Sequence, residues 1–339
     1  MYQELQNNVD LNDKSLLGLA NFKSILFWII HNFKFLLIPG YNLKELSERE
    51  HQYEINHPKK RRNHRYKKPM FIIGLSIILF LCTLAVHQDW ISIYDYWEVE
   101  MCNLPRYLYW YLPPSLEHPL GTTFCGWDIL SRLIYGTRAV LILSVYSTGI
   151  ACVIGVFIGA ITGYYGGWLD TIFMRLMDII LSFPGVVFAI IFIAIWGTDF
   201  TLLVFIYGII GIPFFARIIR TRVIKEKELP YINAGKIAGA KNYRILFRHI
   251  LPNSIQPIII NGSFNIARNI LSLSVLAFLR ISGISWIEWG YDIAIMINYI
   301  YAAPWAAFFP ILMIFLSVLG FLLLGDSLSE IGLLTSEKL

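Results

Sequence analysis

Charged residues are scarce in this chain: Asp, Glu, Lys and Arg make up 15% of its 339 residues, against about 25% in soluble domains. Hydrophobic residues make up 56%, and the mean hydropathy is +0.58. The uncharged stretches are long, and a helix needs roughly 20 apolar residues to cross a bilayer. No alternation of apolar and polar residues indicates a membrane barrel, so we predict an all-α integral membrane protein.

Nucleotide and metal motifs are also absent. Without a G-x-x-x-x-G-K-[ST] phosphate loop, the chain is not expected to bind or hydrolyse ATP itself. No Cys/His spacing resembles a metal site and no Ser/His/Asp set stands out, so no catalytic residue and no metal ligand is predicted. The first 20 residues are polar and mixed in charge, and no cleavable signal peptide is expected.

The net charge of +5 does not indicate nucleic-acid binding, because the basic residues flank hydrophobic segments, where lipid and orientation explain them. Residues 1–69 form a polar, basic-ended extension. Within it, residues 22–37 carry apolar side chains at helical spacing, with Lys23, His31 and Lys34 on the opposing side. This pattern predicts a helix on the membrane surface or on the protein's own cytoplasmic face, and both alternatives stay open.

Six membrane spans are predicted from length and polarity, at 70–86, 138–163, 172–196, 200–220, 255–281 and 305–324. Basic residues cluster before the first span and again after the fourth, between Arg217 and Arg248, so the positive-inside rule places both termini in the cytoplasm. The expected organisation is the extension 1–69, the first helix with an external loop over 70–137, a transmembrane core over 138–330, and a cytoplasmic tail over 331–339.

Four cysteines are present. Cys82 and Cys152 lie in apolar runs and are interpreted as small hydrophobic residues. Cys102 and Cys125 share the predicted external loop, and the sequence leaves open whether they form a disulfide.

Small residues recur every fourth position in the second span, at Ala151, Gly155, Gly159 and Gly163. Such a stripe allows close helix packing, and no transport role is assigned to it. Pro184 and Pro213 lie inside the third and fourth spans, where each predicts a kink that is structural or serves gating.

The spans are interpreted as nearly free of ionisable residues, and the exceptions are Arg175 and Asp178, one turn apart and able to pair with each other. Both lie near the inner end of the third span, where a structural pair is the simpler interpretation. A transporter driven by protons or sodium needs a deeper acidic site, so this pattern counts against a secondary transporter or channel.

The cytoplasmic segment 225–253 contains a short predicted helix with the small residues Ala234, Gly235 and Ala238. We expect that helix to end near Gly239 and a second helix to stop before Pro252. A small-residue helix of this kind can seat in a groove on a partner. A surface loop lying on lipid headgroups is the alternative that these residues leave open.

Landmarks in a fixed order extend over residues 118–330. They are Asn233-Ala234-Gly235 with Gly239 and Leu251-Pro252, His118-Pro119-Leu120-Gly121-Thr122, Asp128 to Leu133, Tyr135 to Arg138, Gly163 to Gly167 with Asp170, Met174-Arg175 with Asp178, Phe183-Pro184, Glu288-Trp289-Gly290, Ala303-Pro304-Trp305 and Leu324-Gly325-Asp326. In these the chain resembles the permease subunits of binding-protein-dependent ABC importers, specifically the C-type second permease of dipeptide and oligopeptide systems.

The resemblance implies a type I ABC importer fold of six membrane helices in the bacterial cytoplasmic membrane. It implies a heterodimer with a second permease, two cytoplasmic ATPase subunits that bind ATP and Mg, and an external solute-binding protein. The residues implied to couple to the ATPase are Asn233, Ala234, Gly235, Gly239, Leu251 and Pro252. Peptide is the expected solute, with nickel or another small solute as the alternative, and no residue that binds the solute can be named.

The chain departs from the family pattern at several positions. Asn233 and Gly235 replace the Glu and the second Ala of the loop signature, and Gly is a weaker helix former by about 1 kcal/mol. Thr123 and Trp127 replace an Asp and an Arg, while Arg280 and Ser282 replace glycines. These changes bear on the external surface that docks the solute-binding protein and on the details of coupling to the ATPase. They leave the predicted fold unaffected.

Overall fold

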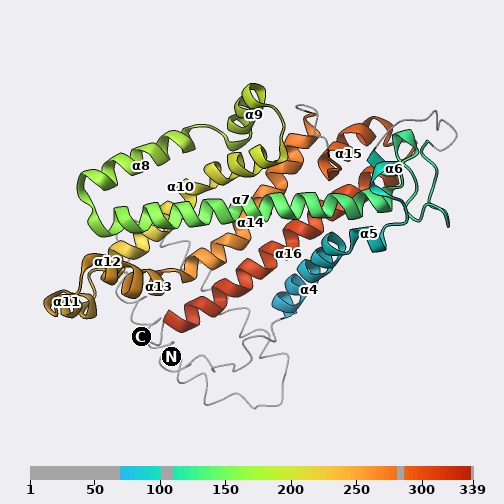
Figure 1. The fold of residues 1–339 in the computed structure, drawn as a ribbon. Helices are drawn as coiled ribbons and strands as arrows, with labels where there is room; N and C mark the ends of the chain where they lie inside the picture. The colour runs from blue at the N-terminus through green and yellow to red at the C-terminus, as the bar shows by residue number, and fades with distance from the viewer. Residues whose placement is uncertain (1–68, 101–109, 281–285, 337–339) are drawn as a thin grey trace, which may run out of the picture. The chain divides into compact units, whose positions relative to one another are not determined.

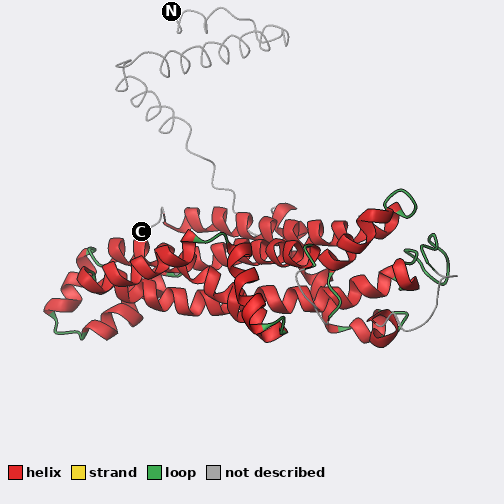
Figure 2. Ribbon diagram, turned by 90° about the horizontal axis from the view of Figure 1, so that it is seen from above, coloured by secondary structure: helices red, strands yellow, loops and turns green. Residues whose placement is uncertain are grey.

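The computed structural model describes residues 69–100, 110–280 and 286–336, with side chains described as far as Ser329. The regular elements of these ranges are helices (Figure 2). The predicted surface helix in the extension, Cys102 and Ser282 lie outside the described residues, as do the side chains of the predicted tail.

Four helices are long and apolar enough to cross a membrane within the ranges that the structure describes. They are α4 (Pro69–Val86), α7 (Ile129–Tyr165), α10 (Phe200–Glu226) and α16 (Pro304–Ser336). Two shorter helices, α8 (Gly167–Ser182) and α9 (Gly185–Trp196), pass the same test together, which gives up to five spans. The predicted fifth span is also a helix, α14 (Gln256–Phe278), but it is not among the helices that are apolar enough.

The helix that contains the predicted second span begins before that span, because α7 begins at Ile129 and not at 138. The Asp128 carboxylate accepts a hydrogen bond from the backbone N–H of Ser131 at 2.8 Å, so Asp128 is the N-cap of the helix. The first turn of the helix contains Arg132 and lies in the part of the chain that precedes the predicted span. That arginine is 3% exposed and is paired inside the protein.

The predicted third span, 172–196, is two helices, and the kink predicted at Pro184 is a break in the chain. The chain breaks at Phe183 and Pro184, where α8 and α9 meet at a bend of 85°. Proline lacks a backbone N–H and disfavours helical backbone in the residue before it, and Phe183 has an extended ψ of 134°. Pro213, by contrast, lies inside the continuous helix α10.

The small-residue stripe of α7 lies against α10, as the parallel course of these helices in Figure 1 suggests. A Cβ on Gly155 would lie 2.7 Å from the Ile212 carbonyl oxygen, and one on Gly159 would lie 2.2 Å from the Ala216 oxygen. Gly163 is similarly close to α10, and Ala151 is fully buried. The absence of larger side chains therefore lets the two backbones approach each other.

Short elements gather at the two ends of the long helices (Figure 1). The end at which α7 begins has α5 (Gln88–Ile91), α6 (Tyr96–Glu100), the 3-10 turns η2 (Phe124–Gly126) and η4 (Ile297–Tyr299), and α15 (Trp289–Met296). The other end has α11 (Pro230–Ile237), α12 (Asn242–Arg244), the π-helical turn η3 (Ile245–Ile250) and α13 (Leu251–Ser254). The apolar core between them is built mainly from α7, α10, α14 and α16.

Candidate functional site

The segment that contains the predicted coupling residues follows α10 directly. The Lys227 ammonium donates a hydrogen bond to the Gly163 carbonyl at 3.0 Å, which ties the end of α10 to the end of α7. Leu229 then has extended backbone, and Pro230 opens α11. Proline suits this first helical position, because the N–H that it lacks would have no partner inside the helix.

Gly239 ends α11 through its backbone conformation. Its φ of +79° lies in the left-handed region that favours glycine. The N–H of Gly239 donates to the Lys236 carbonyl at 3.0 Å, and the N–H of Ala240 donates to the Gly235 carbonyl at 3.1 Å. These two bonds form a Schellman motif, which satisfies carbonyls of the last turn and reverses the chain sharply.

One side chain anchors α11 to the rest of the protein. Ile232 is 2% exposed and lies in one buried apolar cluster with Val223 of α10 and with Ile245 and Ile250. The last two belong to the second limb of the segment, which consists of α12, η3 and α13. Ile237, on the same short helix, is 89% exposed. The helix therefore presents most of its surface to the surroundings.

Four predicted coupling residues lie on or directly after this exposed helix. Asn233, Ala234 and Gly239 are exposed and Gly235 is half-buried. A Cβ added to either glycine would have no described heavy atom within 4 Å. The small residues of α11 thus form an open surface, and they are not needed for packing inside this chain.

The second limb does not stop before Pro252, contrary to the prediction. It continues through α12, η3 and α13 to Ser254. Before the proline, the backbone has a π-helical turn in which the N–H of Leu251 donates to the Leu246 carbonyl, five residues back. A proline disrupts the regular helical bonding pattern, and a local π-helical turn is one way to accommodate that disruption.

Three polar contacts hold the limbs of the segment in place. The Tyr231 hydroxyl donates to the Glu226 carboxylate and accepts a hydrogen bond from the Asn253 amide at 3.0 Å. The Tyr164 hydroxyl at the end of α7 donates to the Asn242 amide oxygen, also at 3.0 Å. Partial burial and the Glu226 carboxylate raise the pKa of Tyr231, so its hydroxyl stays a donor at neutral pH.

Ion pairs join α8 to α10 near the same end. Asp178 lies 2.5 Å from Arg217, closer than the predicted partner Arg175 at 3.9 Å. Asp170 also lies 2.5 Å from Arg220. The sequence missed the two closer pairs, because Arg217 and Arg220 were interpreted only as part of the basic cluster after the fourth span.

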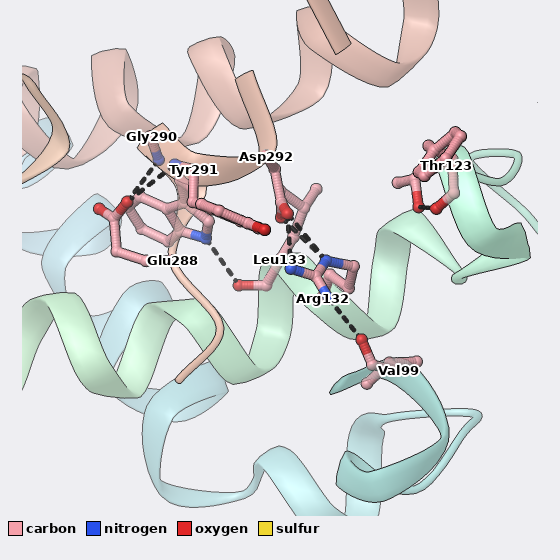
Figure 3. A network of polar contacts seen from close by, with 10 residues as sticks. Val99, Thr123, Arg132, Leu133, Glu288, Gly290, Tyr291 and Asp292 are labelled. Atoms are coloured by element: carbon pink, nitrogen blue, oxygen red, sulfur yellow. Dashed lines mark hydrogen bonds and ion pairs between the residues drawn. The ribbon is translucent and has the colours of Figure 1, made fainter. Parts of the chain in front are cut away.

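A buried polar cluster lies at the opposite end of α7 (Figure 3), and we call Val99, Arg132, Glu288, Trp289 and Asp292 the Arg132 cluster. The Arg132 guanidinium donates to Asp292 at 2.9 Å from Nε and at 2.6 Å from Nη2, and its Nη1 donates to the Val99 carbonyl. Both partners of the ion pair are 3% exposed. The cluster therefore joins α7, α6 and α15.

Glu288 and Trp289 complete the cluster. The Glu288 carboxyl group caps α15 by accepting the N–H of Gly290 at 2.6 Å and of Tyr291 at 3.1 Å. The Trp289 indole N–H donates to the Leu133 carbonyl at 3.1 Å. Burial raises the pKa of Glu288 to about 8. The landmark Glu288-Trp289-Gly290 was recognised in the sequence, but its partners 156 residues earlier in the chain were not.

Other residues of the family landmarks lie near this end of α7, together with positions at which the chain differs from the family pattern. His118 Nδ1 lies 3.1 Å from Asp128, which joins two family landmarks. The ring of Trp127, which stands where the family has Arg, lies 4.2 Å from the Arg132 guanidinium. Thr123 is 2% exposed and bonds to the Phe124 carbonyl. Arg280 has a φ of +52°, a conformation that suits the glycine that the family has there.

The cysteines fall into two groups. Cys125 is disulfide-bonded, while Cys82 and Cys152 are free. The partner considered for Cys125 from the sequence, Cys102, is outside the described residues.

Comparison with known proteins gives a family match over residues 155–331, just over half of the chain, to the binding-protein-dependent transport system inner membrane component. The chain is 36% identical to the dipeptide transport system permease protein DppC of Alkalihalophilus pseudofirmus, covering 78% of this chain and 85% of that protein. It is 36% identical to the glutathione transport system permease protein GsiD of Pectobacterium atrosepticum, covering 75% and 83%. It is 34% identical to DppC of Haemophilus influenzae, covering 76% and 88%. The chain therefore belongs to the inner-membrane permease components of binding-protein-dependent ABC transport systems.

Proposed function

We propose that this chain is the membrane-spanning subunit of an ATP-driven importer of dipeptides or oligopeptides in the bacterial cytoplasmic membrane. It forms half of the translocation pathway with a second permease, receives solute from an external binding protein, and couples to two ATPase subunits that bind ATP and Mg. The chain itself is not a catalyst. The relatives named for dipeptide and glutathione transport support a peptide as the solute, and nickel or another small solute is the alternative.

We also propose six spans with both termini in the cytoplasm. The four long apolar helices and the bent pair α8–α9 supply five of them. The sixth is α14, whose 23 residues are long enough to cross at about 1.5 Å per residue. The basic cluster between Arg217 and Arg248 then lies on the cytoplasmic side with α11, which agrees with the positive-inside rule.

One observation carries the coupling role: α11 projects with a defined end at Gly239 and a single buried anchor, Ile232. A helix held in this way moves as a unit when a partner pulls on it. Ile237 and the small face at Asn233, Ala234 and Gly235 supply the exposed surface that a groove on an ATPase can receive. Leu251 and Pro252 belong to the second limb that supports α11.

The test is ATP-dependent uptake of a labelled dipeptide by the assembled importer with Gly239→Val. Left-handed backbone costs a residue with a side chain about 1–2 kcal/mol, so the end of α11 should change and uptake should fall about tenfold. Gly149→Ala is the matched control, because that glycine is helical, has open space around it and lies in α7 outside the coupling segment, so uptake should stay near normal. Wild-type uptake by Gly239→Val would contradict the coupling role.

Two further measurements separate the proposal from its rivals. The Gly239→Val chain should still co-purify with the second permease, because Gly239 contacts no described packing partner. A secondary transporter or channel would instead move solute when the ATPase subunits are inactive. Uptake that persists without ATP hydrolysis would refute the importer.

A further inference from the structure

Arg268 is a cation halfway along a membrane helix. It lies twelve residues after Gln256 and ten before Phe278 in α14, hence about 15–18 Å from either end. The hydrocarbon core is about 30 Å thick, so the guanidinium is well inside it. The sequence interpretation overlooked this residue when it limited ionisable residues in the spans to Arg175 and Asp178.

The Arg268 side chain is exposed, and the described part of the chain supplies no carboxylate to pair with it. Its guanidinium lies over the ring of Phe214 of α10, 5.1 Å from the ring centroid. This cation–π contact is worth about 0.5–2 kcal/mol and leaves the charge and the N–H donors available. A charge at this depth costs at least about 2.5 kcal/mol when it faces lipid, so the face is covered by something polar.

The surroundings on α14 indicate a wet passage. Asn261 and Ser272 are half-buried and lie seven residues before and four residues after Arg268, which places all three on one face at helical spacing. On the adjoining side of the helix, Asn265 and Asn269 are buried against α7, where each bonds to Thr148 at 3.1 Å. With this polar composition, α14 is not among the helices that are apolar enough to cross a membrane by themselves.

We propose that Arg268 binds the carboxylate of the solute as it passes between this chain and the second permease. The proposal rests on the proposed function, because a peptide with a free C-terminus has a carboxylate and the permease pair encloses the passage. Arginine is suited to this role, because its planar group offers paired donors to both carboxylate oxygens. Phe214 holds the group in place without neutralising it, so the solute can be bound and then released.

The experiment measures ATP-dependent uptake by the full importer of a labelled dipeptide and of its C-terminal amide. Each is supplied at saturation of the binding protein, as fixed by its measured Kd. Arg268→Gln should lower uptake of the free acid about tenfold, the value of a lost charge-assisted hydrogen bond, and change uptake of the amide by less than about twofold. Arg268→Lys keeps the charge and should restore most of the free-acid uptake.

The matched control is Arg222→Gln, an exposed arginine outside the span interior, which should leave both rates unchanged. Equal loss for acid and amide, or no loss for either, would overturn the proposal. Loss of co-purification with the second permease in Arg268→Gln would also overturn it and would assign Arg268 to an acidic residue of that subunit. An absence of any ATP-dependent peptide uptake by the wild type would instead refute the proposed function.

Discussion

The two ends of α7 adjoin regions that differ in burial and in the kind of contact that holds them. At its start, the Arg132 cluster buries an ion pair, a helix cap and an indole hydrogen bond, and Arg132, Glu288 and Asp292 are each at most 3% exposed. Near its other end, α11 exposes most of its residues and has one buried side chain, Ile232. Polar groups fix the geometry in the first region, whereas a backbone motif at Gly239 shapes the second.

The difference teaches where rigidity is needed in this molecule. A buried charge without its partner is costly, so the Arg132 cluster holds α6, α7 and α15 in one arrangement. The α11 segment leaves its surface free for a partner and is joined to the long helices by few contacts, among them Lys227 with Gly163 and Tyr164 with Asn242. Under the proposed coupling role, movement of α11 would reach the ends of α7 and α10 through these contacts, and the Arg132 cluster lies at the other end of α7.

The largest expected effect comes from Arg132→Ala. It would leave Asp292, which is 3% exposed, as a buried carboxylate without its cation, at a cost of about 3–5 kcal/mol in the free energy of unfolding. Thermal unfolding in detergent should show a large fall in Tm and a lower yield of folded protein. The control is Arg175→Gln, whose side chain is 80% exposed and lies 3.9 Å from Asp178. That exposed pair contributes less than about 1 kcal/mol, so equal effects of the two variants would remove the contrast between the ends.

A smaller effect is expected at the close contact between α7 and α10. Gly159→Ala places a Cβ 2.2 Å from the Ala216 carbonyl oxygen, so α7 and α10 must separate. Overpacking of this kind costs about 1–3 kcal/mol, and Tm should fall accordingly. Gly149→Ala on the same helix meets no described heavy atom within 4 Å and should leave Tm nearly unchanged. A Gly159→Ala protein as stable as Gly149→Ala would show that close approach is not required.

Per pH unit, the smallest effect concerns the pH dependence of the Arg132 cluster. Burial raises the pKa of Glu288 to about 8 from 4.5, so folding favours its protonated form. Its contribution to stability is full below pH 4.5 and is lost as pH rises toward 8, by up to about 1.4 kcal/mol per pH unit. Tm of the wild type should therefore fall relative to Glu288→Gln between pH 5 and 8. Parallel pH profiles of the two proteins would rule out titration of Glu288 in the fold.

Several features of the fold could be predicted from local sequence. Runs of apolar residues define α4, α10 and α16 because a membrane helix satisfies its own backbone hydrogen bonds. Gly239 marked the end of α11 because the left-handed conformation favours glycine locally. Pro184 predicted a kink, but one residue type does not specify an angle, and the 85° break depends on how α8 and α9 pack.

The sequence by itself determined the class of the protein: a membrane protein of helices, with a family signature in the segment between α10 and α14. Those features depend on composition and on neighbouring residues, which the chain carries whatever its fold. Only the tertiary structure decided that Arg132 pairs with Asp292, that Asp178 is closest to Arg217, and that Arg268 has no described carboxylate partner. Pairing of charges depends on which helices become neighbours, and residues 160 positions apart give no local sign of it.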